Sequence, residues 1–319
     1  MNLRMCMASI VPADAPTDVR TSSKVGQARH TARFGTLGVM DSARMDALVD
    51  ALVERVQSTL TGAPPSSDAA VRWTYGAGWN ANVTLVPREV IHAAGRTDAR
   101  VARHIDHTLL KPEATRDQVV KLCEEAKRYR FFSVCVNSSN VALCADLLRG
   151  SDTVPICVVG FPLGACLGSV KAFEAVEAIK LGAKEIDTVV NIGALKSGDY
   201  QTVLEDLAVT VEASRPYPVK VILETSKLTN EEKVAACVLS RQAGAAFVKT
   251  STGFGGGGAT LEDVRLMKRV VGGAGIKVKA SGGVRTHEDA WRMLEAGADR
   301  LGASSSVAVV TGGVGAEGY

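Results

Sequence analysis

The stretch AGAAFVKTSTGFGGGG, residues 243–258, runs from a helix end through a short strand into a glycine-rich loop, and this unit is the basis for predicting the architecture. Its first half recurs as LGAKEID at residues 181–187 and as AGADRLG at residues 296–302. In each copy a glycine separates a helix-like run from an apolar strand, and glycine favours the left-handed conformation that often ends helices. The repeat therefore predicts one recurring turn from helix to strand.

Short apolar strands alternate with amphipathic helices from His104 onward. Over about 200 residues this alternation predicts a (β/α)₈ TIM barrel. A doubly wound sheet is the alternative, but it usually has a glycine-rich turn after its first strand. Here that turn is LLKPEAT, and the glycines follow strands six to eight. The predicted strands are 104–110, 131–137, 155–161, 185–191, 219–225, 247–252, 276–282 and 300–304.

The chain before the barrel divides into two parts. Residues 1–40 are rich in Pro, Ser, Thr and Gly without periodicity, so we expect a disordered tail. Their Arg, Ser and Thr content would also suit a transit peptide, and Met40 or Met45 could be the true start. We expect residues 41–100 to form an N-terminal extension with one helix at 45–60, and residues 101–319 to form the barrel with a flexible C-terminal tail.

Composition narrows the class of protein. The chain has 319 residues and a net charge of +3, from 37 basic and 34 acidic residues, which argues against a nucleic-acid partner. No apolar run reaches the roughly 18 residues of a membrane helix. The seven cysteines are scattered without CxxC pairs, which favours reduced thiols in the cytoplasm. His104 and His107 are three apart on a strand and point to opposite faces, so we expect no metal site. No cofactor is expected either.

Active sites of such barrels lie at the C-terminal ends of the strands. Lys249 and Lys279 are one βα unit apart, so they lie on neighbouring strands. A lysine beside a second ammonium loses its proton more easily and can attack a carbonyl to form a Schiff base, with Asp187 as general acid and base. Snorkelling surface lysines are the structural alternative. Other polar residues at strand ends are Asp106, Thr108, Cys135, Asn137, Asn191 and Glu224.

Three loops on one side of the barrel mouth are rich in glycine and serine: TSTGFGGGG, SGGVRT and GASSS. Backbone N–H groups and serine hydroxyls in such loops bind anions, and many barrels bind phosphate after strands seven and eight. These loops predict a phosphate site. For residues 255–258 a merely flexible loop is the alternative.

The segments HIDHTLLKPEAT, EIDTVVNIGALKSGDY, FVKTSTGFG and KVKASGGVRT resemble deoxyribose-phosphate aldolases, the metal-independent class I family, over roughly residues 100–310. The resemblance implies cleavage of 2-deoxy-D-ribose 5-phosphate into D-glyceraldehyde 3-phosphate and acetaldehyde. It implies that Lys249 forms the Schiff base, that Lys279 perturbs its pKa and that Asp187 relays protons. The predicted substrate-binding residues are Asp106, Thr108, Cys135 and Thr252, with Gly253, Gly282, Gly283, Gly302, Ser304 and Ser305 around the phosphate.

Two features depart from the family pattern or extend it. Phe254 stands where some members have a phosphate-binding lysine. The chain ends in Tyr319, and some members end in a tyrosine that assists proton transfer, although the tail itself does not align. The expected partner is a phosphorylated sugar, and a homodimer or homotetramer is compatible. A different Schiff-base barrel enzyme and a non-catalytic barrel scaffold are the rival hypotheses, and the intact trio of Asp187, Lys249 and Lys279 argues against a scaffold.

Overall fold

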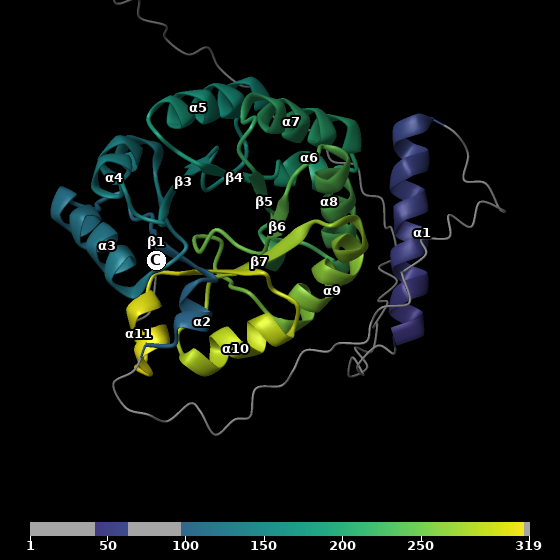
Figure 1. Cartoon of the computed structure of the whole chain (residues 1–319). Helices are drawn as coiled ribbons and strands as arrows, with labels where there is room; N and C mark the ends of the chain where they lie inside the picture. Colours follow the sequence, from purple (N-terminus) through teal and green to yellow (C-terminus); the bar gives the residue numbers. More distant parts are fainter. Residues whose placement is uncertain (1–41, 63–96, 316–319) are drawn as a thin grey trace, which may run out of the picture. The chain divides into compact units, whose positions relative to one another are not determined.

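The computed structural model describes residues 42–62 and 97–315, and its strands form a closed parallel barrel (Figure 1). The strands neighbour one another in chain order, and β8 closes the barrel on β1 by pairing Leu301 with Ile105. This confirms the (β/α)₈ barrel and excludes the doubly wound sheet. The strands are β1 (Ile105–Leu109), β2 (Ser133–Val136), β3 (Val154–Val159), β4 (Glu185–Val189), β5 (Val219–Ile222), β6 (Phe247–Lys249), β7 (Lys277–Ser281) and β8 (Arg300–Ala303).

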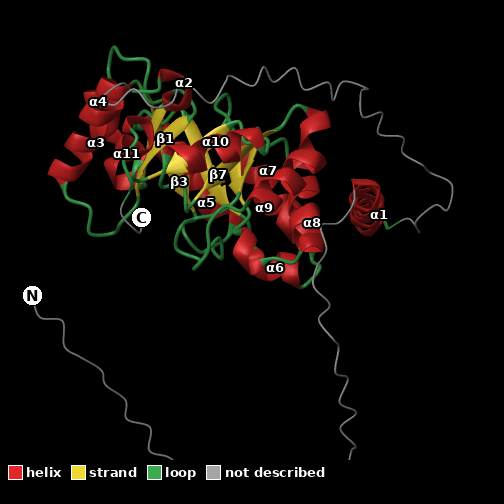
Figure 2. Ribbon diagram, turned by 90° about the horizontal axis from the view of Figure 1, so that it is seen from below, coloured by secondary structure: helices red, strands yellow, loops and turns green. Residues whose placement is uncertain are grey.

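Helices surround the strands on the outside, as Figure 2 shows from below. One helix follows each strand, except that two follow β4. These helices are α3 (Arg116–Tyr129), α4 (Val141–Leu147), α5 (Gly168–Lys180), α6 (Ile192–Lys196), α7 (Tyr200–Ala213), α8 (Asn230–Gln242), α9 (Leu261–Val271), α10 (His287–Glu295) and α11 (Ser306–Thr311). A further short helix, α2 (Ala99–Ala102), precedes β1. The short 3₁₀ turns η2 (Ser138–Asn140), η3 (Thr225–Lys227) and η4 (Gly272–Ala274) complete the loops.

The recurring turn from helix to strand is a C-terminal glycine cap. Gly182, Gly244 and Gly297 all have positive φ, at 111°, 83° and 112°. The residue after each glycine donates its N–H to a carbonyl five positions back, for example Ala183 to Ala178 at 3.0 Å. This is the pattern of the Schellman motif, which satisfies carbonyls at the end of a helix. The predicted left-handed glycines are therefore confirmed.

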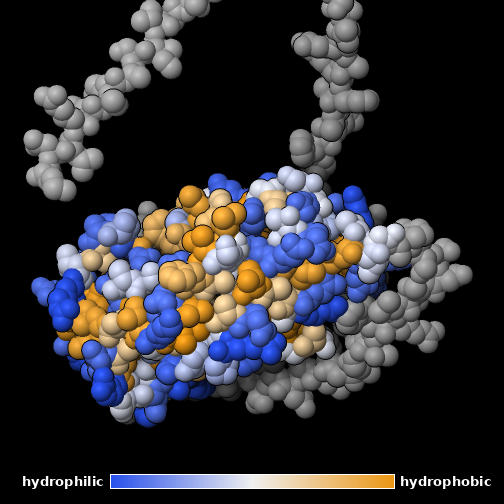
Figure 3. Space-filling view, turned by 90° about the horizontal axis from the view of Figure 1, so that it is seen from above, coloured by the Kyte–Doolittle hydropathy of each residue, from blue (hydrophilic) through white to orange (hydrophobic). Residues whose placement is uncertain are grey.

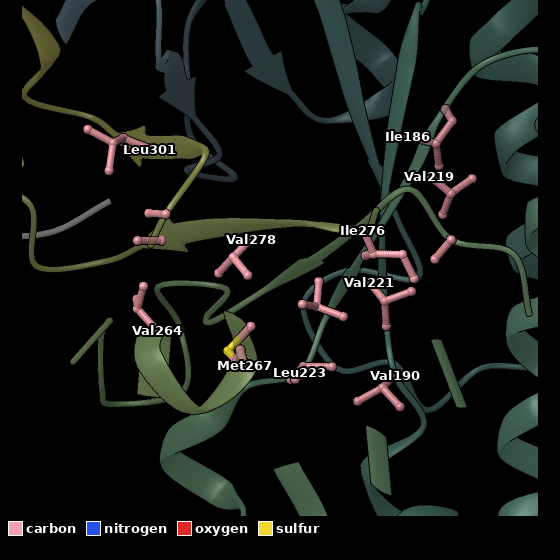
Figure 4. Packing of buried hydrophobic residues seen from close by; sticks show 14 of the residues in the cluster. Ile186, Val190, Val219, Val221, Leu223, Val264, Met267, Ile276, Val278 and Leu301 are labelled. Carbon is pink, nitrogen blue, oxygen red and sulfur yellow. The ribbon is translucent and has the colours of Figure 1, made fainter. Parts of the chain in front are cut away.

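Apolar side chains fill the layer between strands and helices. Strand residues alternate, so that Ile186, Val221, Val278 and Leu301 point outward and are fully buried against the helices (Figure 4). Val264 and Met267 of α9 contribute to the same cluster. This layer holds the barrel together and leaves the inward-facing positions for other side chains.

The N-terminal extension contains helix α1 (Ser42–Thr61), slightly longer than the predicted 45–60. Its residues Val49, Leu52, Val53 and Val56 are buried in the main apolar cluster, and α1 contacts α7 and α8. The predictions for residues 1–40 and for Tyr319 lie outside the described residues. Among the helices that the structure does describe, none is long and apolar enough to span a bilayer.

One face of the molecule carries exposed apolar side chains. Leu163 and Leu167 in the loop before α5 are each 73% exposed, and Phe173 on α5 is 67% exposed. Figure 3, seen from the side of α5 and α7, shows apolar and hydrophilic side chains interspersed on this face. Exposed apolar patches on soluble proteins often mark contact surfaces.

Candidate active site

The inside of this barrel is charged, whereas barrel interiors usually hold branched apolar side chains. The inward-facing positions of six strands carry acids and bases, and each of these side chains is at most 8% exposed. They are the carboxylates Asp106, Glu185 and Asp187 and the cations Lys220, Lys249, Lys279 and Arg300.

Asp187 on β4 is the centre of this network. Its Oδ2 accepts hydrogen bonds from Lys249 Nζ and from Lys279 Nζ, each at 2.9 Å. Its Oδ1 accepts from Lys220 Nζ, also at 2.9 Å. Lys249 and Lys279 are register partners on β6 and β7. The structure therefore brings the predicted trio together, and neither lysine is a snorkelling surface residue.

The predicted residue Asp106 on β1 also belongs to the network. Its Oδ2 forms an ion pair with Lys279 at 2.6 Å, and its Oδ1 accepts hydrogen bonds from Arg300 and from the hydroxyl of Ser133, each at 2.7 Å. It therefore anchors Lys279 on the side opposite Asp187.

Sequence reasoning missed Glu185, Lys220 and Arg300. Glu185 bonds Lys220 at 2.5 Å and Arg300 at 3.3 Å. The sequence did contain a signal for these residues. Each of the three lies an even number of positions from a residue at the end of the same strand that was singled out, namely Asp187, Glu224 or Gly302. Side chains two apart on a strand share a face, so Glu185 had to point the same way as Asp187.

Charge balance distinguishes Lys249 from the other interior cations. Three lysines and one arginine face three carboxylates, so one positive charge is in excess. Burial lowers the pKa of Lys249, and the charge of Lys279 lowers it further against the attraction of Asp187. Burial also opposes the charged forms of Lys220, Lys279 and Arg300, but their carboxylate partners raise each pKa above its usual value. Lys249 is therefore the one of these four cations that loses its proton most readily.

Asp187 is held as a carboxylate. Burial alone would raise its pKa, but the charges of Lys220, Lys249 and Lys279 outweigh burial and hold the pKa well below the usual range. A buried amine that can be neutral, next to an ionised acid, is suited to attack a carbonyl and to move protons at the resulting adduct.

An apolar wall lies beside the lysines. Thr108 and Cys135 are register partners on β1 and β2, and both are buried. Cys135 packs with Leu110, Ile156 and Val158, and Phe161 covers this cluster. Burial raises the pKa of the Cys135 thiol. The wall would suit the unsubstituted carbons of a small aldehyde better than a hydroxylated chain.

The glycine-rich loops after β6, β7 and β8 enclose a cavity of about 280 Å³. All six residues predicted to surround a phosphate line it, and Arg285 in SGGVRT lines it too, although it was not predicted. Thr252 does not line the cavity, because its buried hydroxyl turns to Glu224 and accepts from the N–H of Phe254. The lining residues are Gly253, Gly256, Gly257, Gly258, Gly282, Gly283, Val284, Arg285, Gly302, Ala303, Ser304 and Ser305.

Close packing explains most of the glycines in residues 255–258. A Cβ on Gly255 would lie 2.5–2.8 Å from the carboxylate of Glu224, and one on Gly257 would lie 2.5 Å from the Ser226 side chain. A Cβ on Gly258 would lie 2.7 Å from the backbone of Gly282. A side chain at Gly257 or Gly258 would collide with Ser226 Cβ or with backbone, and one at Gly255 would have to displace the buried carboxylate of Glu224. Steric fit therefore accounts for these glycines without appeal to flexibility.

The remaining polar residues at strand ends have local roles. The Asn191 side chain caps α6 by accepting from the N–H of Ala194 at 3.1 Å. The Asn137 amide donates to the carbonyl of Leu110 at 3.1 Å. His104 and His107 bind separate partners, since His107 contacts Glu125 and Ser306 while His104 contacts the backbone of Asp299. Within residues 42–62 and 97–315, no three His, Cys, Asp or Glu side chains gather as a metal site would require.

A closed (β/α)₈ barrel with ionisable side chains in its interior and a cavity formed by the loops that follow β6, β7 and β8 defines a barrel enzyme. Residues 100–315 match the DeoC/LacD family of aldolases, and the chain belongs to that family of lyases.

Similar proteins with known names support this family assignment. A deoxyribose-phosphate aldolase of Halalkalibacterium halodurans is 58% identical over 214 residues, which cover 66% of this chain and 95% of that protein. The deoxyribose-phosphate aldolase of Bdellovibrio bacteriovorus is 54% identical over 220 residues, 69% of this chain and all of that protein. A tetrameric deoxyribose phosphate aldolase structure from Aeropyrum pernix matches with a TM-score of 0.63 and 34% identity, covering 66% of this chain and 90% of that one.

Proposed function

We propose that this chain is a class I aldolase that reversibly cleaves 2-deoxy-D-ribose 5-phosphate into D-glyceraldehyde 3-phosphate and acetaldehyde through a Schiff base on Lys249. One observation carries the proposal: Lys249 has a buried amine with a lowered pKa, hydrogen-bonded to Asp187 at 2.9 Å. The names of the relatives support the substrate.

The first half of the reaction uses the neutral amine. Lys249 adds to the C1 aldehyde of the open-chain sugar, and loss of water gives a protonated imine. The C3 hydroxyl then gives its proton to Asp187, directly or through water. The C2–C3 bonding electrons move into the imine, so that the bond breaks and glyceraldehyde 3-phosphate leaves. Lys279 stays protonated throughout and favours the neutral form of Lys249.

The second half restores the enzyme. The enamine left on Lys249 takes a proton at C2, which becomes the methyl group of acetaldehyde. Water then adds to the imine carbon and releases acetaldehyde with the free amine. Asp187 is the proposed proton relay for both steps, and the apolar wall around Cys135 accommodates the two-carbon fragment. Asp106 and Thr108 complete the proposed sugar site.

The cavity lined by glycine, Ser304 and Ser305 is the proposed phosphate site. Its loops offer backbone N–H groups and hydroxyls, which suit an anion. Phe254 cannot supply a cation; its ring instead packs edge-on against Phe161 at 5.4 Å between centroids.

The cellular setting is part of the proposal. We propose a cytoplasmic enzyme of deoxynucleoside breakdown that works as a homo-oligomer. Tetramer formation by the Aeropyrum pernix relative and the exposed apolar side chains near α5 support self-association. The six cysteines within the described ranges are free thiols.

A coupled assay tests the function. Purified protein should release glyceraldehyde 3-phosphate from deoxyribose 5-phosphate, and the reverse reaction should require acetaldehyde as donor. A different Schiff-base aldolase would prefer a larger, hydroxylated donor, and a scaffold would show no turnover with either.

The aldolase rate is expected to be unchanged in EDTA. The protonated imine is the electron sink, so the proposed steps need no Lewis acid. The rate is measured after dialysis against EDTA, and again after zinc is added back. A loss in EDTA that zinc reverses would contradict the proposal.

Deletion of residues 1–40 is expected to leave kcat within about twofold, a barrier change below about 0.4 kcal/mol. This segment lacks periodicity, and none of the predicted site residues comes from it. Turnover is compared for folded full-length and shortened protein. A tenfold drop would show that the segment contributes to catalysis.

We also propose that Tyr319 assists proton transfer at the enamine carbon. Tyr319→Phe should slow deuterium incorporation into acetaldehyde, while borohydride still traps the imine on Lys249. If deuterium exchange stays at the wild-type rate, Asp187 and water suffice as the relay.

A further inference from the structure

Glu224 contacts the glycine-rich loop after β6 but does not line the cavity. It lies two residues beyond the end of β5, and its carboxylate Oε2 accepts hydrogen bonds from the hydroxyl and from the N–H of Thr252, the latter at 3.3 Å. The same carboxylate lies against the backbone of Gly255, where a Cβ would come within 2.8 Å of its oxygens. Glu224 therefore touches the loop on both sides of Gly253 and Phe254.

The backbone at Glu224 is unusual. Its φ of 57° and ψ of 61° lie in the left-handed region, where only one other non-glycine residue of the described chain, Arg130, is found. Residues other than glycine adopt this conformation at a cost and keep it where the surroundings require it. Here the conformation directs an acidic side chain, 3% exposed, toward the β6–α9 loop.

Other contacts hold the β6–α9 loop on the C-terminal side of Gly255. Ser226, two residues after Glu224, packs so closely against Gly257 that a Cβ there would lie 2.5 Å from its side chain. The N–H of Ala259 donates to the carbonyls of Ser281 and Gly282 at 3.1 and 3.0 Å. Between these contacts, Gly253 and Gly256–Gly258 line the cavity. Glu224 itself does not line it, so it acts on the cavity through the loop.

We propose that Glu224 is a positioning residue that fixes the β6–α9 loop in the shape that binds the phosphate of the substrate. This inference rests on the proposed function, because it assigns the cavity to the phosphate. Because the loop is already ordered before the anion binds, binding costs little conformational entropy. The carboxylate acts as an acceptor for Thr252 and not as a group that touches the sugar.

Three substitutions of Glu224 test the proposal. Glu224→Gln keeps an acceptor oxygen for Thr252, whereas Glu224→Ala and Glu224→Gly remove it, and glycine also removes the backbone strain. KM and kcat are measured with deoxyribose 5-phosphate and with unphosphorylated deoxyribose. Glu231→Ala, an exposed acid at the start of α8, is the matched control.

Loss of the acceptor should raise KM for the phosphorylated sugar about tenfold, with kcat and the constants for deoxyribose within about twofold. Glu224→Gln and Glu231→Ala should stay near wild type. Because glycine relieves the strain, Glu224→Gly should show the same KM change as Glu224→Ala even if the protein is more stable. Equal changes for both sugars, or none, would overturn the proposal.

Binding of inorganic phosphate, measured by calorimetry, separates this inference from the proposed function. If wild-type protein binds phosphate, and the alanine and glycine variants bind it about tenfold more weakly, Glu224 positions the loop whatever sugar is cleaved. If wild-type protein cleaves deoxyribose 5-phosphate and all variants bind phosphate equally, the aldolase function stands and the role of Glu224 is wrong.

Discussion

Lys249→Met is expected to reduce aldolase turnover by at least about 10⁴-fold, because methionine fills a similar volume but has no amine to form the imine. Lys249 is 2% exposed, so a side chain of similar size should preserve packing in the barrel. Turnover is measured by release of glyceraldehyde 3-phosphate. Folding is checked by circular dichroism.

Borohydride trapping locates the nucleophile in the same experiment. Reduction in the presence of acetaldehyde should convert the Lys249 amine to an N-ethyl amine, a net gain of C₂H₄ on the wild-type peptide, and Lys249→Met should show no such gain. The exposed Lys227 provides the control, since Lys227→Met should turn over and be trapped like wild type. An adduct on Lys279 would reverse the proposed roles of the two lysines.

Lys279→Met is expected to move the acidic limb of the pH profile of kcat/KM to higher pH and to lower the rate at about pH 7 by roughly 10²-fold. The active form of Lys249 is the neutral amine, so activity falls as pH falls through its pKa. The charge of Lys279 helps to lower that pKa, after burial as the larger cause. Without Lys279, the attraction of Asp187 for the Lys249 ammonium is less opposed, so the pKa rises.

The pH profiles of wild type, Lys279→Met and Lys279→Arg distinguish an electrostatic effect from a structural one. Activity of Lys279→Met should recover at high pH, where Lys249 is neutral again. Lys279→Arg keeps the positive charge and should leave the acidic limb near its wild-type position. A rate that is low at every pH, with an unmoved limb, would show that Lys279 acts by another route.

Local patterns in the sequence were sufficient to predict the architecture. Helix and strand periodicities, together with the glycine turns at Gly182, Gly244 and Gly297, are encoded within a few neighbouring residues, so they could be read without coordinates. The spacing of Lys249 and Lys279 by one βα unit placed them on adjacent strands for the same reason. The three glycine-rich loops were likewise predicted to meet, because loops after successive strands share one end of the barrel.

Contacts between residues distant in sequence needed the tertiary structure. Asp187 reaches Lys249 and Lys279, 62 and 92 positions away, only because the barrel closes around its axis. The same closure adds Lys220, Glu185 and Arg300 to the network. It also sets Asp106 beside Lys279, whose pKa is raised, while burial and the charge of Lys279 lower the pKa of Lys249. No residue pattern specifies how charges from six strands balance in a shared interior, because each pKa depends on distances to all the others.

The glycine-rich loop shows the same division on a smaller scale. By itself the sequence determined that residues 253–258 form a loop rich in glycine at the end of a strand. The contact of Glu224 with Gly255 and that of Ser226 with Gly257 come from a different βα unit. Only the packing of the two units decided that these glycines are required by steric fit, since a collision with a missing Cβ depends on where the neighbouring loop lies in space.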